Sequence, residues 1–116
     1  MKLCGACILT DNAPRLAAFY QAIFQESPVV EGSHYGFDNA QLAVYDPGNV
    51  TVPQAKGMSL MYFVPDVLAS YERLRTIPGI RIASPPTRRP WGAFSFWILD
   101  PDGNTISFIE KASKDG

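Results

Sequence analysis

Two cysteines near the start of the chain stand at a spacing that redox and metal sites use. Cys4 and Cys7 form a Cys-x-x-Cys motif, which could act as a redox pair or as half of a zinc site. Redox pairs stand at a helix N-terminus, which lowers the thiol pKa, whereas this motif opens a predicted strand. Residues three apart on a strand point to opposite faces, and a zinc site would need more ligands than these cysteines and His34. We therefore expect two buried, reduced strand cysteines.

Two further groups carry side chains that could take part in acid–base or anion chemistry. His34, the only histidine, could act as a general base beside Glu31, but it lies in a predicted hairpin, where an exposed polar residue is the simpler interpretation. Arg88 and Arg89, followed by Trp91, lie on a long predicted connection and could contact an anionic group of a substrate. A solvated loop is the favoured interpretation of that segment, so neither group is assigned a catalytic role.

Asp100 and Asp102 could be interpreted as an acid–base pair, but they belong to the sequence Asp-Pro-Asp-Gly-Asn. Such residues form turns, because Asp and Asn side chains hydrogen-bond to the nearby backbone and Gly adopts conformations that other residues avoid. Apolar, β-rich runs at 94–99 and 105–110 flank the turn. The segment therefore predicts a β-hairpin closed by a five-residue loop.

The composition of the 116-residue chain is that of one compact globular protein. Hydrophobic residues make up 47% and charged residues 18%, and the formal net charge is −1. The chain has no long basic run, which argues against binding to nucleic acid or to an anionic membrane surface. The apolar stretch from Leu3 to Leu9 is too short for a signal segment or a membrane span. We therefore expect a cytoplasmic protein.

Apolar periodicity in the first half of the chain predicts one helix among four strands. A strand at 3–10 leads to a helix capped by Asp11 or Asn12. The apolar positions of this helix follow the spacing of one helical face: Leu16, Phe19, Tyr20, Ile23 and Phe24. Turn-forming residues separate the remaining strands, which are predicted near 28–31, 34–38 and 41–45.

The same order of elements is repeated in the second half of the chain. A strand at 58–64 is followed by a helix that Asp66 caps, and three more strands are predicted at 80–84, 94–99 and 105–110. We interpret the chain as a single domain, residues 1–116, with repeats at about 1–50 and about 58–112 and a linker at about 51–57. A ferredoxin-like α+β sandwich is the alternative for such a pattern.

The repeat and the closing hairpin resemble those of the vicinal oxygen chelate superfamily, which includes glyoxalase I, extradiol dioxygenases and the fosfomycin and bleomycin resistance proteins. The Asp100–Asn104 turn and the helix pattern ending in Phe19-Tyr20 carry the resemblance most specifically, although Asn12 stands where an acidic residue is more common. The resemblance covers essentially the whole chain. It implies an α+β fold in which two βαβββ modules form a curved mixed sheet around a cleft.

Metal-dependent members of the superfamily hold a divalent ion with four inward side chains, one from each of four strands. The resemblance assigns these positions to Gly5, Ala43, Ser59 and Ser107. None of the four carries a carboxylate or an imidazole, which are the groups that such ions require. The chain is therefore expected to use no metal and no other cofactor.

Strand alternation then divides the side chains between the helices and the implied cleft. Opposed residues in a hairpin share a face, and the loop length pairs Trp97 with Ser107, so both face the cleft while Phe96 packs under a helix. The expected ligand-binding side chains are mainly apolar or aromatic, with a few polar groups: Leu9, Gln41, Tyr45, Ser59, Met61, Phe63, Trp97 and Ser107. Such a lining is typical of a small-molecule site, although the same side chains could simply fill the interior.

The favoured function is that of a metal-free protein that sequesters a planar or apolar small molecule, as in the bleomycin-resistance branch that the chain resembles. The alternatives are a metal-independent enzyme that uses His34 or Glu110 in proton transfer, a regulatory or interaction protein with a vestigial cleft, and, last, a metal-dependent lyase, isomerase or dioxygenase. Relatives of this size usually dimerise, so the resemblance also implies a symmetric homodimer. The expected partner is a small molecule rather than nucleic acid or a membrane.

Overall fold

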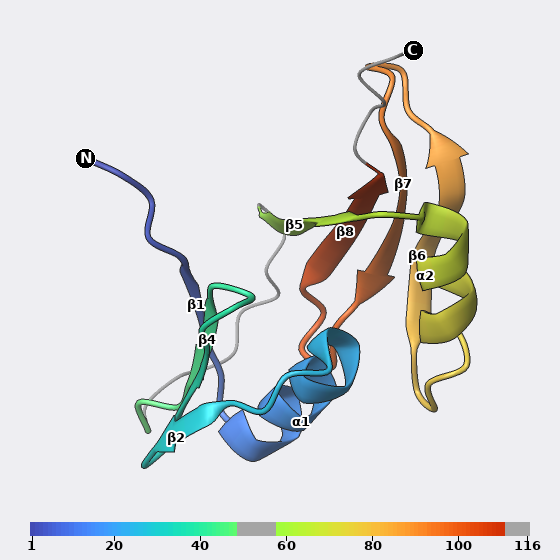
Figure 1. Cartoon of the computed structure of the whole chain (residues 1–116). Helices are drawn as coiled ribbons and strands as arrows, with labels where there is room; N and C mark the ends of the chain where they lie inside the picture. The colour runs from blue at the N-terminus through green and yellow to red at the C-terminus, as the bar shows by residue number, and fades with distance from the viewer. Residues whose placement is uncertain (49–57, 111–116) are drawn as a thin grey trace. The chain divides into compact units, whose positions relative to one another are not determined.

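The computed structural model describes residues 1–48 and 58–110 of the chain (Figure 1). The chain divides into two compact units, Met1–Pro53 and Gln54–Gly116. Within the described residues, each unit contains one four-stranded mixed sheet and one helix in the order β-α-β-β-β. The predicted α+β fold class and its internal repeat are therefore confirmed.

The sheet of the first unit, called sheet A, has the strand order β1-β4-β3-β2. Strands β1 and β4 are parallel, and the other neighbours are antiparallel. The helix begins at Ala13 because the Asn12 side chain accepts a hydrogen bond from the Arg15 amide at 3.2 Å. It ends at Phe24, because the next residue, Gln25, is left-handed with φ of 53°. The elements of this unit are β1 (Ala6–Leu9), α1 (Ala13–Phe24), β2 (Val29–Glu31), β3 (His34–Phe37) and β4 (Leu42–Tyr45).

Helix α1 covers one face of sheet A. Its buried side includes Leu16, Tyr20 and Ile23, as the predicted helical face requires. The Phe24 ring meets Phe37 of β3 edge-on with ring centroids 5.5 Å apart. From β4, Leu42 and Val44 are also buried, so alternate residues of this strand complete the apolar layer beneath the helix.

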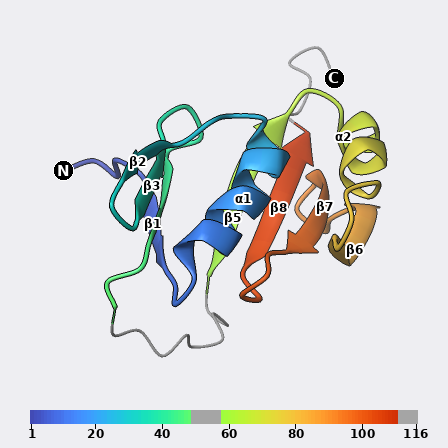
Figure 2. The same ribbon diagram turned by 90° about the horizontal axis from the view of Figure 1, so that it is seen from below.

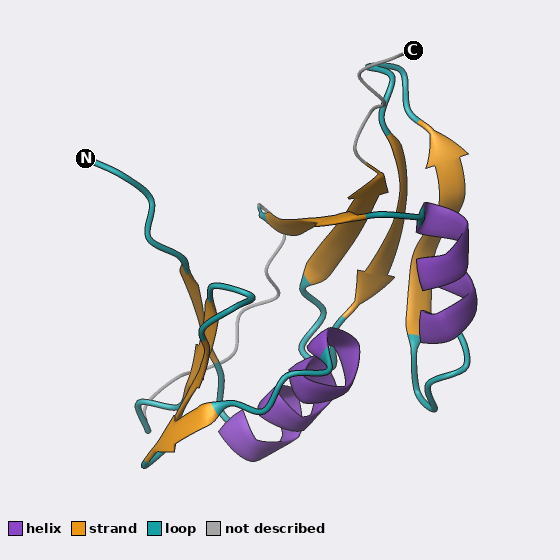
Figure 3. Cartoon of the chain, in the orientation of Figure 1, coloured by secondary structure: helices purple, strands orange, loops and turns teal. Residues whose placement is uncertain are grey.

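The sheet of the second unit, called sheet B, has the strand order β5-β8-β7-β6. Strands β5 and β8 are parallel, whereas β8, β7 and β6 form an antiparallel meander (Figure 3). The Asp66 side chain caps the helix by accepting a hydrogen bond from the Ala69 amide at 3.1 Å. The elements are β5 (Ser59–Val64), α2 (Val67–Leu74), β6 (Arg81–Arg88), β7 (Phe94–Leu99) and β8 (Thr105–Glu110).

Helix α2 lies against sheet B (Figure 2), and aromatic packing holds it there. The Phe96 ring of β7 is fully buried, meets Tyr71 of α2 at 5.4 Å and stacks on Phe108 of β8 at 5.0 Å. In the described ranges 1–48 and 58–110, no helix is long and apolar enough to cross a membrane.

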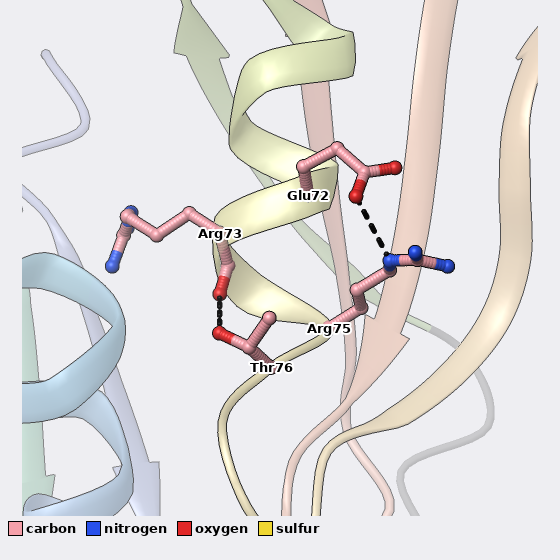
Figure 4. Close-up of polar contacts among 4 residues, drawn as sticks. All are labelled: Glu72, Arg73, Arg75 and Thr76. Carbon is pink, nitrogen blue, oxygen red and sulfur yellow. Dashed lines mark hydrogen bonds and ion pairs between the residues drawn. The ribbon is translucent and has the colours of Figure 1, made fainter.

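The C-terminal end of α2 carries exposed polar contacts (Figure 4). The Thr76 hydroxyl donates to the Arg73 carbonyl at 2.7 Å, and Arg75 Nε lies 3.1 Å from Glu72 Oε2. Solvent-exposed ion pairs of this kind contribute less than about 1 kcal/mol. The burial of the α2 apolar face therefore stabilises the helix more than these contacts do.

Strand β6 is longer than its predicted range of 80–84, because it continues through Pro85 and Pro86 to Arg88. Proline is tolerated here because β6 is an edge strand, so one side of its backbone needs no hydrogen-bond donors. The register against β7 shifts between Ile82 and Ser84 and again between Ser84 and Thr87. These register shifts allow the strand to continue through the two prolines, so that Arg89 is the first residue after its end.

Candidate functional site

Sheet B has one face that its helix leaves open, and five predicted ligand-binding residues lie on it. Trp97 pairs with Ser107, as the loop length predicted, and Met61 of β5 pairs with Ser107 from the other side. Paired residues share a face, so Ser59 and Phe63, two positions from Met61, lie there too. The neighbouring Phe96 is buried beneath α2, which confirms the predicted orientation of the hairpin.

The open face of sheet B is most exposed along its β5 edge. Met61 and Phe63 are each 69% exposed, Trp97 is half-buried and Ser107 is buried. The Ser59 hydroxyl donates to the Leu60 carbonyl at 3.2 Å. Three large apolar side chains thus share this face with two hydroxyl groups, an arrangement that can bind an apolar molecule and orient it with few polar contacts.

Arg89 adds a cation to this face. Its guanidinium carbon lies 4.1 Å from the centre of the Trp97 ring, so the charged group stacks on the indole. Nε donates to the Ser95 hydroxyl at 2.9 Å, and Nη2 donates to the Ser84 hydroxyl at 3.1 Å and to the Ser95 carbonyl at 3.2 Å. The sequence interpretation as a solvated loop is therefore wrong for Arg89, because the extension of β6 brings it back over β7.

The neighbours of Arg89 in the sequence do not share its position. Arg88 Nη1 donates to the Gly92 carbonyl at 2.8 Å, and the guanidinium lies 5.2 Å from the centre of the Phe94 ring. Trp91 is 72% exposed. Of the three residues that sequence reasoning grouped together, the structure brings only Arg89 to Trp97.

Sheet A also has an open face, which carries the other three predicted ligand-binding residues. Leu9 pairs with Tyr45, and both side chains are exposed. Gln41, just before β4, has φ of 56°, and its carbonyl accepts a hydrogen bond from the Ala6 amide at 3.1 Å. A hollow of about 430 Å³ lies on this unit, and its lining includes small residues and three polar or charged ones: Cys7, Gly36, Ala43, His34, Asp38 and Gln41.

Both cysteines are free and exposed, so the prediction that they are buried is wrong. Strand β1 begins only at Ala6, and Gly5 between the two cysteines has φ of 151°, which interrupts the expected strand alternation. As a result, Cys4 and Cys7 line the same hollow. Partial desolvation of its thiol nevertheless raises the pKa of Cys7 above its ordinary value. This favours the protonated thiol and opposes the activation that redox cysteines need.

The four positions assigned to metal ligands do not fit a divalent ion. Gly5 and Ala43 offer no side-chain donor, and Ser59 and Ser107 offer only hydroxyl groups. A Cβ atom on Gly5 would lie 2.9 Å from the Gln41 carbonyl oxygen, so a ligand side chain cannot be placed there without moving the backbone. Across residues 1–48 and 58–110, no group of three or more His, Cys, Asp or Glu side chains could hold a metal ion.

The candidate proton-transfer groups lie in separate units. His34 is half-buried at the start of β3, pairs with Glu31, and its ring centroid lies 5.9 Å from that of Tyr45. Glu110 ends β8 opposite Phe94 in the other unit. No described residue hydrogen-bonds to the His34 ring, so nothing in this part of the structure orients it as a general base.

Asp100 is a structural residue of the hairpin turn, as predicted. Its Oδ1 accepts hydrogen bonds from the amides of Asp102 at 2.9 Å and Asn104 at 2.8 Å. Its Oδ2 accepts from Asn104 Nδ2 at 2.7 Å. These contacts close the loop that sets the register of β7 and β8, and thereby the position of Trp97 opposite Ser107.

A comparison with known families decides where this fold belongs. The family model described as the Glyoxalase/Bleomycin resistance protein/Dioxygenase superfamily matches residues 4–108. The chain belongs to this superfamily. The match spans both repeats, and it confirms the resemblance that the closing hairpin and the first helix predicted. None of the curated proteins compared with the chain matches it.

Solved structures show the same glyoxalase-superfamily fold. A protein of unknown function from Agrobacterium tumefaciens has a TM-score of 0.78 at 21% identity, covering 97% of this chain and 95% of that one. A glyoxalase/bleomycin resistance protein/dioxygenase from Nocardioides has a TM-score of 0.76 at 19% identity, with coverages of 100% and 89%. A superfamily member from Sphaerobacter thermophilus has a TM-score of 0.70 at 21% identity, with coverages of 96% and 98%. At these identities, the likeness shows a shared fold.

Proposed function

We propose that this protein is a metal-free member of the superfamily that binds and sequesters a planar or apolar small molecule. The observation that carries the proposal is the open face of sheet B, which Met61, Phe63 and Trp97 share with the hydroxyls of Ser59 and Ser107. An apolar surface with few polar groups favours binding over bond breaking, because no nucleophile with an adjacent base lies among these side chains.

Binding of an uncharged aromatic dye to the open face tests this function. Phenylnaphthylamine, which fluoresces in apolar surroundings, is expected to bind wild-type protein saturably. Trp97→Ala should weaken this binding at least about tenfold, since an aromatic contact contributes about 1 kcal/mol beyond the buried area and tenfold corresponds to about 1.4 kcal/mol. Dye titration of both proteins measures the change.

Trp91→Ala is the matched control for this titration. Trp91 is the only other tryptophan and is 72% exposed, so its removal should leave the affinity for phenylnaphthylamine unchanged within about twofold. The Trp91→Phe protein leaves Trp97 as the single tryptophan, whose emission should change as the dye binds. Equal affinities of the Trp97→Ala and Trp91→Ala proteins would overturn the proposed site.

We expect divalent metals to leave the stability of the protein unchanged. A metal ion that binds specifically and is present at a hundred times its Kd would add about 2.7 kcal/mol to the free energy of unfolding. In a domain of this size, that would raise the Tm by many degrees. With no carboxylate or imidazole at Gly5, Ala43, Ser59 or Ser107, titration with Zn²⁺, Ni²⁺, Fe²⁺ or Mn²⁺ should not raise the Tm. A stoichiometric metal that raises it would contradict the metal-free assignment.

We also propose that the protein forms a symmetric homodimer. Strand β5 is an end strand of its sheet and carries the exposed Met61 and Phe63. An uncovered sheet edge with apolar side chains invites pairing with a second chain. Light scattering at tens of micromolar should give twice the mass of the chain, whereas the mass of one chain at every concentration would exclude the dimer.

A further inference from the structure

The guanidinium of Arg89 is a fixed cation on the open face of sheet B. Three hydrogen bonds from Nε and Nη2 hold it to Ser84 and Ser95, and it stacks 4.1 Å from the centre of the Trp97 ring. Its backbone is fixed as well, since the Arg89 amide donates to the Ala93 carbonyl at 2.7 Å and its carbonyl accepts from the Gly92 amide at 2.9 Å. The charge is therefore held in place before any ligand arrives, which lowers the entropic cost of binding.

In the part of the chain that the structure describes, every atom that accepts a hydrogen bond from this guanidinium belongs to a neutral group. The atoms that accept its hydrogen bonds are two serine hydroxyls and one carbonyl, and no described carboxylate forms an ion pair with it. The side chains that β5, β7 and β8 pair on this face include no acidic residue. Within the described residues, both N–H groups of Nη1 make no hydrogen bond. They remain available to an oxyanion.

We propose that Arg89 recognises an anionic group of the ligand, so that the sequestered molecule is an aromatic or apolar acid. Its carboxylate or related oxyanion would accept hydrogen bonds from Nη1, while its planar body would lie beside the Arg89–Trp97 stack, against the neighbouring apolar side chains. Arg89 is suited to this role because its guanidinium presents paired donors in a rigid plane. The inference rests on the proposed function and adds the charge class of its ligand.

Two dyes that differ only in an anionic group test the inference. Anilinonaphthalene sulfonate is the sulfonated form of the uncharged phenylnaphthylamine, and wild-type protein should bind the sulfonated dye more tightly. Arg89→Gln should weaken binding of the anionic dye about tenfold or more, while the uncharged dye changes less than about twofold. Arg88→Gln is the matched control, because it removes a neighbouring charge whose side chain is bonded to Gly92. It should leave both affinities unchanged.

The Arg89→Lys variant shows whether the effect of Arg89→Gln comes from the lost charge or from a disturbed structure. The lysine keeps the positive charge but lacks the guanidinium fork, so it should retain part of the preference for the anionic dye even where the Tm falls. Equal wild-type affinity for the two dyes, or equal losses in the Arg89→Gln and Arg88→Gln proteins, would overturn the role of Arg89 and leave the binding function standing. If the wild-type protein bound neither dye, both the role of Arg89 and the proposed binding function would be overturned.

Discussion

Replacing Phe96 with alanine is expected to lower the free energy of unfolding by about 3–5 kcal/mol, the cost of deleting a buried phenylalanine ring. Phe96 is fully buried and packs between Tyr71 of α2, at 5.4 Å, and Phe108 of β8, at 5.0 Å. Because it joins the helix to the sheet, the cavity left by its truncation cannot close without moving α2. Urea denaturation of the whole chain measures the loss.

Two matched variants show whether the loss of stability arises because Phe96 lies on the face of sheet B that α2 covers. Trp91→Ala removes a larger ring from an exposed position and should change the free energy of unfolding by less than about 0.5 kcal/mol. Trp97→Ala, on the open face, should cost less than Phe96→Ala. If Trp97→Ala were the more destabilising of the two, the faces of β7 would be assigned the wrong way round, and the proposed site would fall with that assignment.

The sequence was sufficient to predict the hairpin that carries Trp97 and Ser107. The five-residue loop fixes the register, because β7 and β8 pair residue against residue from Leu99 and Thr105 outward. The alternation of Ile106 and Phe108 with Thr105 and Ser107 then decides which side faces the helix. Both signals are local, so no knowledge of the other elements is needed to place Trp97 opposite Ser107.

The position of Arg89 could not be predicted in the same way. Pro85 and Pro86 suggested the end of a strand, but an edge strand can continue through proline when its neighbour supplies the pairing. The two register shifts in β6 also break the period-two pattern from which faces are read. The pairing of β6 with β7 therefore decides which side chain contacts Trp97. This pairing is part of the tertiary structure, and the local sequence carries little information about it.

The exposure of the cysteines has a comparable cause. Alternation predicts opposite faces for Cys4 and Cys7 only if the backbone between them is regular, and Gly5 with φ of 151° makes it irregular. The reason lies elsewhere in the unit, where the Gln41 carbonyl comes so close that only a residue without a Cβ fits beside it. The glycine that breaks the cysteine pattern is also the position that the resemblance assigns to a metal ligand.

Replacing Asp100 with alanine is expected to destabilise the protein by about 2–4 kcal/mol, because each buried donor left without a partner costs about 1–3 kcal/mol. The fully buried carboxylate accepts from the amides of Asp102 and Asn104 and from the Asn104 side chain. The alanine variant removes every one of these acceptors. Urea denaturation gives the loss in stability.

Asp100→Asn is the matched comparison, since its side-chain oxygen can still accept the two backbone hydrogen bonds at the Oδ1 position. It should therefore cost less than the alanine variant, although it loses the charged acceptor of the Asn104 side chain. Comparing the stability losses of the two variants shows whether Asp100 forms the turn or acts in catalysis. A catalytic acid or base could be removed without weakening the hairpin. An Asp100→Ala protein as stable as wild type would mean that this carboxylate does not hold β7 and β8 in register, and the acid–base interpretation of the residue would have to be taken up again.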